Sequence, residues 1–260
     1  MRKRYRSVTI YNVDFKNRLL YTCRMASHDF HLPDSPDSTH FQTRECTRSA
    51  CGLRFPALLG DPRAERCPAC RAHTRVVTAH YARAVVEPEI GRVCGPELEV
   101  LLDNIRSAWN VGSMLRSADG AGVRRVHLCG VSSPPDHPKV AKTALGAEKS
   151  LPWNSSPNGV AAAQALKDQG LRLWALEGGT SAESLFETAA DLPGSPLVLV
   201  AGNELSGVDP GILDLCERVV CLPMRGVKGS LNVAVAFGIA VYYIRFGGLA
   251  PRASFGKDLR

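Results

Sequence analysis

The chain has 260 residues, of which 45% are hydrophobic, and its mean hydropathy is −0.08. That is enough apolar material for the cores of one or two globular domains. The longest apolar run, 233–244, is shorter than the ~20 residues that a membrane-spanning helix needs, and no apolar signal core follows the basic N-terminus. The composition therefore argues against a membrane protein and predicts a cytoplasmic one.

The formal net charge of +7 is confined to the first third of the chain. Residues 1–96 hold sixteen Lys and Arg against nine Asp and Glu, whereas 97–260 hold sixteen of each. A basic segment gains affinity for a polyanion by releasing counterions, so this distribution favours a nucleic-acid partner. The alternative is an arginine-rich surface that only keeps the protein in solution.

The N-terminal third divides by composition into three parts. Residues 1–45 form a basic segment, in which 6–13 alternates weakly like a strand and 32–43 is rich in Pro, Ser and Asp like a loop. Residues 46–75 hold a cysteine module. Residues 76–96 form a linker that ends in Pro and Gly.

Four of the nine cysteines are clustered, with the spacing Cys46-x4-Cys51-x15-Cys67-x2-Cys70. Two such pairs on a short, loop-rich segment can place four thiolates in a tetrahedron around Zn2+, and this clustering is typical of a reducing compartment. Because so short a segment has little core of its own, metal binding would supply much of its stability. The alternatives are free buried cysteines or a redox pair at Cys67 and Cys70.

From Glu97 onward, short apolar segments alternate with segments of helical periodicity. The pattern predicts an α/β domain over 97–250 with a mostly parallel sheet, followed by a tail at 251–260. The expected strands are 98–102, 125–129, 172–176, 197–201 and 219–222. The expected helices are 110–121, 137–147, 159–169, 210–216 and 230–245.

Two segments of this domain pass from a strand into the start of a helix. The first, 103–119, opens its helix with Asn110, predicted at the N-cap, where free amide donors can meet a phosphate. The other, 219–234, passes through a basic, Gly-rich turn to Ser230, which we predict caps the last helix. Either junction alone is common in α/β proteins, so helix capping is an alternative role for both polar residues.

A third segment, 197–209, runs from a buried strand into a polar loop flanked by glycines. Gly202 allows a ligand to approach the backbone, and Glu204 lies just past the strand end, where open α/β sheets bind their ligands. The chain has no G-x-G-x-x-G after its first strand, no G-x-x-x-x-G-K-[ST] and no G-x-S-x-G. These absences argue against a Rossmann cofactor site, a P-loop and a hydrolase nucleophile elbow.

In this order and spacing, the three segments resemble the motifs of the SpoU–TrmH family of RNA methyltransferases, within the SPOUT superfamily, over residues 97–247. The first motif, N-x-G-x-x-x-R-[ST]-A, spans 110–118, and the second, G-N-E-x-x-G, spans 202–207. The third, L-P-M-x-G-x-x-x-S-L-N-V-[AS]-V-A, spans 222–236. The cysteine module resembles zinc ribbons that precede this domain in some relatives. One departure is Gly229, where many relatives carry a larger, often acidic residue.

The resemblance implies a parallel sheet whose C-terminal segment is threaded through a trefoil knot. It also implies a homodimer with the helices 110–121 and 230–245 at the interface. The last helix is apolar over much of its circumference, which suits burial in an interface or in a core. The implied function is S-adenosylmethionine-dependent 2'-O-methylation of a ribose in rRNA or tRNA.

The resemblance assigns residues to this reaction as well. Backbone groups of the knot loops would hold S-adenosylmethionine, at Val200, Ala201, Gly202, Leu222, Met224, Ser230 and Leu231. Arg116 would assist the ribose hydroxyl, either with a nearby RNA phosphate that promotes deprotonation or purely through its positive charge. The residues that would hold substrate, cofactor and this arginine in register are Asn110, Glu204, Ser230 and Asn232. Arg225 and Lys228 flank the cofactor turn and would either contact RNA phosphate or remain solvated.

Two other functions are compatible with the same motifs. One is a non-catalytic RNA-binding or ribosome assembly factor that keeps the fold, for which Arg116 would serve only in a surface or dimer salt bridge. The other is an enzyme that methylates a base nitrogen. Transfer of a labelled methyl group separates the first alternative, and resistance of the product to alkali separates the second.

Overall fold

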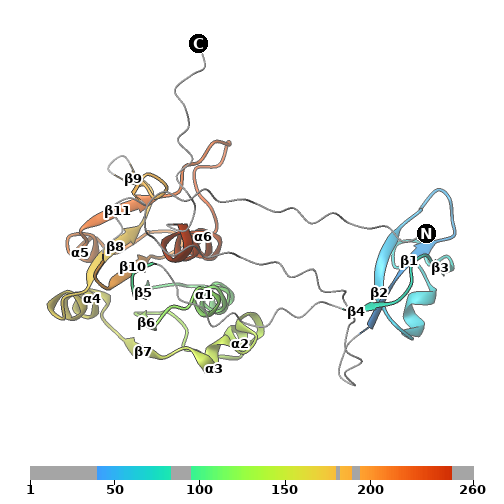
Figure 1. Ribbon diagram of the computed structural model, residues 1–260, viewed down its shortest axis with the longest axis horizontal. Coiled ribbons are helices and arrows are strands. Elements are labelled where there is room, and N and C mark those ends of the chain that lie inside the picture. The colour runs from blue at the N-terminus through green and yellow to red at the C-terminus, as the bar shows by residue number, and fades with distance from the viewer. Residues whose placement is uncertain (1–39, 83–94, 180–181, 189–193, 248–260) are drawn as a thin grey trace, which may run out of the picture. The chain divides into compact units, whose positions relative to one another are not determined.

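The computed structural model of the chain describes residues 40–82, 95–179, 182–188 and 194–247. The chain forms two compact units, one on each side of residue 90 (Figure 1). The strand expected at 6–13 and the tail at 251–260 lie outside the described residues. Within the described ranges, no helix is both long enough and apolar enough to span a membrane.

The first unit is a small antiparallel sheet organised around β1 (His40–Cys46). β1 pairs with β2 (Arg54–Leu58), β3 (Thr74–Val76) and β4 (Tyr81–Ala82), and a 3-10 helix at Pro62–Glu65 follows β2. The strands therefore extend beyond both ends of the predicted cysteine module, into segments that the sequence indicated as loop and linker. Pairing around the cysteine turns places these strands, whereas their own apolar patterns are too short to reveal them.

Few side chains are buried in this first unit. Among its described residues, the buried apolar side chains are Cys46, Ala57, Ala64 and Cys67. None of them is a large aliphatic or aromatic residue, so hydrophobic burial contributes little to the stability of this sheet. A fold of this kind needs another source of stability, and the two cysteines in its small core indicate where that source lies.

The second unit is built on a seven-stranded sheet, which confirms the predicted α/β class. Its strand order is β7-β6-β5-β10-β8-β11-β9, and adjacent strands are parallel throughout. In chain order the strands are β5 (Leu98–Asp103), β6 (Arg125–Cys129), β7 (Trp153–Ser156), β8 (Arg172–Leu176), β9 (Glu183–Ser184), β10 (Leu197–Ala201) and β11 (Arg218–Cys221). The two edge strands, β7 and β9, were not predicted because they are short and mostly polar.

Helices cover both faces of this sheet (Figure 1). On one face lie α1 (Ala108–Gly120), α2 (Pro138–Ala144), α3 (Ala147–Ser150) and α6 (Val233–Phe246). On the other face lie α4 (Gly159–Asp168) and α5 (Pro210–Leu213). The central strand β10 is sandwiched between the two layers, and all five of its residues are fully buried. This explains why it reads as a continuous apolar run.

The predicted caps of the first and last helices of this unit are wrong. The Ser107 hydroxyl caps α1 by accepting a hydrogen bond from the Asn110 N–H at 3.4 Å, so Asn110 lies inside the first turn. At α6, the side-chain oxygen of Asn232 accepts hydrogen bonds from the first amides of the helix, and Ser230 lies before the cap. The amide nitrogens of both asparagine side chains take no part in capping and donate hydrogen bonds elsewhere.

The helix expected at 137–147 is divided into α2 and α3. Leu145 and Gly146 break it, since both have positive φ angles, 52° and 104°. Leu145 is largely exposed, so no core packing holds the segment in helical conformation at this point.

The strand order changes direction next to β5. From β5 the chain adds β6 and β7 on one side, whereas β10, β8, β11 and β9 lie on the other side. Open α/β sheets bind ligands at the carboxyl ends of the strands near such a change. The knotted path of the C-terminal segment stays a prediction.

Candidate functional site

A cleft of about 400 Å3 lies where β8, β10 and β11 end. Its walls come from three loops, one after each of these strands, and from the beginning of α6. The residues that line it are Leu176, Glu177, Gly178, Gly202, Asn203, Glu204, Leu205, Gly207, Cys221, Leu222, Met224, Gly229, Ser230, Leu231, Asn232, Val233 and Ala236. The second and third predicted motifs therefore meet in one cavity.

Most of the residues predicted to hold the cofactor line this cleft. They are Gly202, Leu222, Met224, Ser230 and Leu231. The other two, Val200 and Ala201, are fully buried in β10. Their backbone positions face β5 and β8 in the sheet, so these two residues support the cleft from behind and do not line it.

The loop after β10 folds back tightly on itself. Asn203 and Gly207 exchange two backbone hydrogen bonds of 2.9 Å, and Gly207 has a φ of 76°. A Cβ atom at Gly202 would lie 2.3 Å from the backbone of Gly207 and Val208. Both glycines are therefore required by the turn itself, and the loop presents its backbone to the cleft.

Glu204 fastens this loop to the start of α1. Its carboxylate accepts hydrogen bonds from the Arg106 N–H (2.9 Å), the Ser107 N–H (3.0 Å) and the Asn110 side-chain amide (2.9 Å). Burial raises the pKa of Glu204, but these hydrogen bonds outweigh it and hold the pKa below its usual value. An ionised carboxylate at a helix N-terminus also interacts favourably with the helix dipole.

Asn232 extends the same network to the third motif. Its oxygen accepts from the Ala234 and Val235 amides, which fixes the side chain as the cap of α6. Its amide nitrogen then donates to the side-chain oxygen of Asn110 at 3.2 Å. Asn110, Glu204 and Asn232 thus link all three predicted motifs through side chains alone.

The structure does not bring Arg116 to this network. Arg116 is exposed on α1, six residues beyond Asn110, which places it on a different side of the helix. It does not line the cleft, and its side chain makes no ion pair or hydrogen bond with any residue that the structure describes. Arg225 and Lys228 are also exposed, on the loop between β11 and α6 that forms one wall of the cleft.

Sequence reasoning missed Glu177, which follows β8 and lines the cleft. Its carboxylate accepts hydrogen bonds from the Val208 N–H (2.9 Å) and from the Gly178 N–H (3.0 Å). It therefore braces the loop after β10 from the opposite wall. The signal was present in the sequence, since a strand followed by Glu-Gly-Gly repeats the pattern of an apolar strand that ends in polar residues and glycine.

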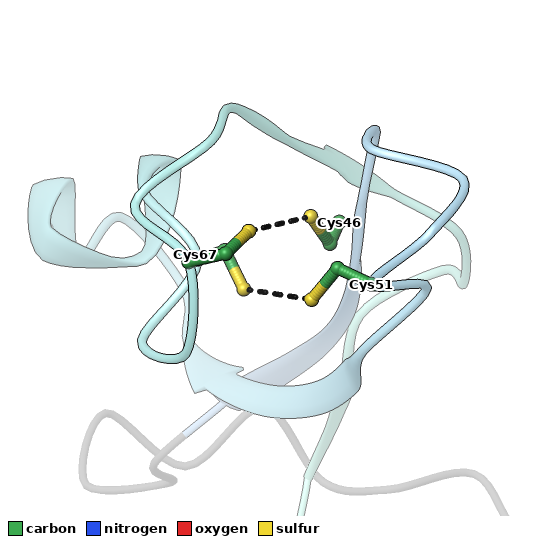
Figure 2. A group of neighbouring side chains, drawn as sticks. Cys46, Cys51 and Cys67 are labelled. Atoms are coloured by element: carbon green, nitrogen blue, oxygen red, sulfur yellow. Dashed lines mark hydrogen bonds between the residues drawn. The ribbon is translucent and has the colours of Figure 1, made fainter.

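The four clustered cysteines converge in the first unit. All four sulfur atoms lie within 4.8 Å of one another, with 3.5 Å between Cys46 and Cys70 and 3.8 Å between Cys51 and Cys67. Figure 2 shows Cys46 and Cys51 facing the turn that carries Cys67. Four ligands at the Zn–S bond length of about 2.3 Å would place neighbouring sulfurs roughly 3.8 Å apart. The residues present therefore fit a tetrahedral Zn2+.

The turn at the second cysteine pair favours a thiolate. Burial raises the pKa of Cys67, but hydrogen bonds from the backbone N–H groups of Cys70 and Ala69 lower it to about 7. Such amide donors also stabilise a sulfur atom that is bound to a metal.

Comparison with known proteins places this chain in a family. The fold and the cleft define the class as an α/β protein with a ligand site at the carboxyl ends of its strands. The model of the SpoU rRNA Methylase family matches residues 97–242, which is more than half of the chain, so the chain belongs to that family. This confirms the resemblance seen in the three motifs.

Relatives and solved structures agree with this assignment. The chain is 32% identical over 163 residues to the 23S rRNA (guanosine-2'-O-)-methyltransferase RlmB of Pseudomonas syringae, a match that covers 62% of this chain and 63% of that enzyme. The chain thus spans less than two thirds of the relative's length.

The TrmH/SpoU tRNA modifying enzyme of A. aeolicus superposes with a TM-score of 0.51 at 28% identity, covering 57% of this chain and 74% of that one. The SpoU methyltransferase AviRb of Streptomyces viridochromogenes, in complex with AdoMet, has a TM-score of 0.54 at 22% identity, covering 69% and 70% of the two chains. This second likeness concerns the fold.

Proposed function

We propose that this protein transfers a methyl group from S-adenosylmethionine to the 2'-hydroxyl of a ribose in ribosomal RNA. The observation that carries the proposal is the hydrogen-bonded set of Asn110, Glu204 and Asn232, which joins the three family motifs beside a cleft at the carboxyl ends of the strands. Membership of the SpoU family and the activity named for the Pseudomonas syringae relative support it.

The cleft suits the methyl donor in size and chemistry. Its volume of about 400 Å3 falls in the range of roughly 300–1,000 Å3 that small-molecule sites occupy. Glycines at 178, 202, 207 and 229 leave backbone groups accessible, and Leu222, Met224 and Leu231 add apolar surface. When bound, S-adenosylmethionine supplies an electrophilic methyl group, whose bond to the sulfonium breaks as the sulfur departs as a neutral thioether. The chain has to hold the ribose hydroxyl in line and stabilise the charge that develops on its oxygen.

We infer that Arg116 performs this second task in the cleft of a second copy. A guanidinium stays protonated in proteins, so it acts through its positive charge and hydrogen-bond donors. Arg116 lies outside the cleft of its own chain, on the helix that packs against α6. A twofold contact through α1 and α6 would set this surface against the same surface of the partner, next to the partner's cleft.

The exposed surface of α1 and α6 supports such a homodimer. Val235, Ile239 and Tyr242 form a stripe along α6, with 39–52% of each residue exposed, and Trp109 on α1 is 46% exposed. Apolar side chains at this spacing lie on one face of a helix. A monomer would leave the whole stripe in water, whereas a twofold partner would cover it.

The remaining site residues have proposed roles outside the hydrogen-bonded set. Ser230 lines the cleft and would contact the cofactor or the ribose. Arg225 and Lys228 would contact RNA phosphates beside the cleft, because both are exposed cations on its wall loop. The four cysteines would hold a structural Zn2+, which supplies folding energy and no catalytic step.

Transfer of a labelled methyl group to ribosomal RNA tests this proposal. The wild-type chain should label RNA in a product that resists alkaline cleavage, since a 2'-O-methyl group removes the attacking hydroxyl. The Arg116→Ala chain should still bind S-adenosylmethionine but lose about 100-fold or more in rate, as expected when a group that stabilises developing charge is removed. RNA binding without any transfer would instead indicate a non-catalytic factor, and an alkali-sensitive labelled product would indicate base methylation.

Mixed dimers test where Arg116 acts. Arg116→Ala and Asn110→Ala chains are each expected to be inactive alone. If the arginine serves the partner's cleft, a mixture of the two contains dimers with one complete site, and part of the activity returns. If Arg116 instead acts in the cleft of the chain that carries it, every cleft in the mixture lacks either Arg116 or Asn110. The mixture would then stay inactive.

A further inference from the structure

The arginines of the first unit divide into two groups of different surroundings. Among the described residues 40–82, six arginines are exposed and a seventh, Arg44, is partly buried and hydrogen-bonds to Thr74. Three of the exposed six have acidic partners. Arg63 forms an ion pair with Asp61 at 3.0 Å. The Glu45 carboxylate forms ion pairs with both Arg75, at 2.7 Å, and Arg54, at 3.8 Å. Two carboxylates thus offset two of these three positive charges on the protein itself.

The other three, Arg48, Arg66 and Arg71, are exposed and have no such partner. Their side chains make no ion pair or hydrogen bond with any residue that the structure describes. All three border the cysteine turns. Arg48 lies between the first two cysteines, Arg66 directly precedes the third, and Arg71 directly follows the fourth.

The two cysteine turns lie side by side, so the three unpartnered arginines belong to one end of the unit. The four sulfur atoms lie within 4.8 Å of one another. Thr47, next to Arg48, donates to the His73 carbonyl through its N–H (3.0 Å) and its hydroxyl (2.9 Å). Arg66 forms a backbone bridge with the same His73. The three arginines are thus anchored on backbone that a metal ion would hold rigid.

Apolar exposure lies at the other end of the same sheet. Phe41 pairs with Leu58 and with Tyr81, five residues along β1 from Cys46, which is about 17 Å in a strand. Leu58 and Tyr81 are both more than 40% exposed. The cysteine end therefore carries the three unpartnered cationic side chains, whereas among the exposed large apolar side chains of 40–82 only Val76, opposite Arg44, pairs within two residues of Cys46.

We propose that Arg48, Arg66 and Arg71 form a clamp for the phosphate backbone of RNA, and that the first unit grips the substrate through its metal-binding end. A guanidinium binds phosphate through two parallel hydrogen bonds. A rigid support limits the ordering cost of binding to the three side chains, because their backbone is already fixed. The proposal rests on the proposed function, because it takes the RNA substrate of the second unit as the ligand.

Two triple variants of the full-length, zinc-loaded chain test the clamp, because they remove the same charge from different places. One replaces Arg48, Arg66 and Arg71 by Gln, and its matched control replaces Arg54, Arg63 and Arg75 by Gln. Binding of a fluorescently labelled ribosomal stem–loop RNA is measured from about 50 to 200 mM salt, over which phosphate contacts lose affinity steeply. The clamp variant should bind at least 10-fold more weakly at low salt, and its salt dependence should fall by about two to three released ions. The control should change affinity less than threefold.

Equal losses in the two variants would overturn the clamp, since net charge alone would then explain the binding. No loss in the clamp variant would overturn it as well. A third variant, with Lys at positions 48, 66 and 71, guards against damage to the metal site. It should keep both zinc and most of the salt dependence. A Gln variant that loses zinc, together with a Lys variant that keeps zinc but binds RNA no better, would show that the arginines serve the metal site and would also refute the clamp.

The same samples separate failure of the clamp from failure of the proposed function. If the wild-type chain binds RNA in a clamp-dependent way but transfers no methyl group, the proposed function fails and the clamp stands. If it methylates RNA and both triple variants bind RNA equally well, the clamp fails and the proposed function stands.

Discussion

The two units of this chain differ in the interactions that stabilise each of them. The second unit buries two extensive sets of apolar side chains, one on each face of a seven-stranded sheet. The described part of the first unit buries only two alanines and two cysteines among its apolar side chains. The same chain therefore combines a fold that follows from hydrophobic patterning with one that we propose is stabilised by a metal ion on four converging cysteines. We propose that the two units also differ in function. The second unit carries the reaction cleft at the edge of its sheet, and the first unit carries unpartnered arginines that bind RNA.

Removal of the metal should have the largest effect, and this effect should be confined to the first unit. A Cys67→Ser chain, or wild type with a strong chelator, should lose the fold of the first unit while the second unit remains intact. Apparent binding free energies of structural zinc are about 10–16 kcal/mol at pH 7, more than so small a core can replace. Hydrogen exchange should show loss of protection in 40–82 only. Cys216→Ser is the control, because Cys216 lies outside the cluster and should change neither unit.

A cavity in the central strand should destabilise the second unit and leave the first unit unchanged. Leu199→Ala removes a fully buried side chain from β10 and should cost the second unit about 2–5 kcal/mol of unfolding free energy. All three tryptophans, Trp109, Trp153 and Trp174, lie in this unit, so their fluorescence during denaturation reports on it alone. Zinc content of the first unit should not change. A simultaneous loss of zinc would show that the two units fold as one.

Loss of the Glu204 carboxylate should have an intermediate effect. Glu204→Gln keeps the shape of the side chain but removes a charge that three hydrogen-bond donors share. We expect a loss of about 1–3 kcal/mol of stability and a fall of roughly 10-fold or more in methyl transfer. A variant that transfers methyl groups at the wild-type rate would contradict the role of this network.

The pH dependence of the Glu204 effect follows from the direction of its pKa shift. The folded-state pKa of Glu204 is lowered, so its contribution is fully present above the unfolded-state value of about 4.3 and is lost as pH falls through the folded value. The stability difference between wild type and Glu204→Gln should therefore be constant near neutral pH and shrink below about pH 4. Denaturant titrations of both chains at several pH values measure it.

The smallest effect is expected at Glu177. Glu177→Gln leaves a side chain that can still accept a hydrogen bond from the Val208 N–H, but the bond is no longer charge-assisted. We expect the binding free energy of S-adenosylmethionine to weaken by about 1 kcal/mol. This loss should appear as a few-fold rise in KM for S-adenosylmethionine with kcat nearly unchanged. A selective fall in kcat would place Glu177 in the chemical step and not in support of the cofactor loop.

The sequence predicted those features that rest on local patterns. The buried strand at 197–201 and the convergence of four cysteines follow from apolar runs and ligand spacing. Glu204 was placed correctly at a strand end. Features decided by tertiary contacts were missed or misplaced, namely β7 and β9, the capping roles of Ser107 and Asn232, and Glu177, which contacts a loop 31 residues further along the chain. The position of Arg116 outside its own cleft also follows only from the assembled helix.

The most direct test of the account is calorimetric titration of S-adenosylmethionine into the full-length chain, with Gly202→Ala as the matched variant. The wild-type chain should bind one equivalent of the methyl donor. Gly202→Ala should lose that binding, because the added methyl group would meet the backbone of Gly207 and displace the loop after β10. A wild-type chain that takes up no donor, or a well-folded Gly202→Ala chain that binds as tightly as wild type, would contradict the assignment of this cleft.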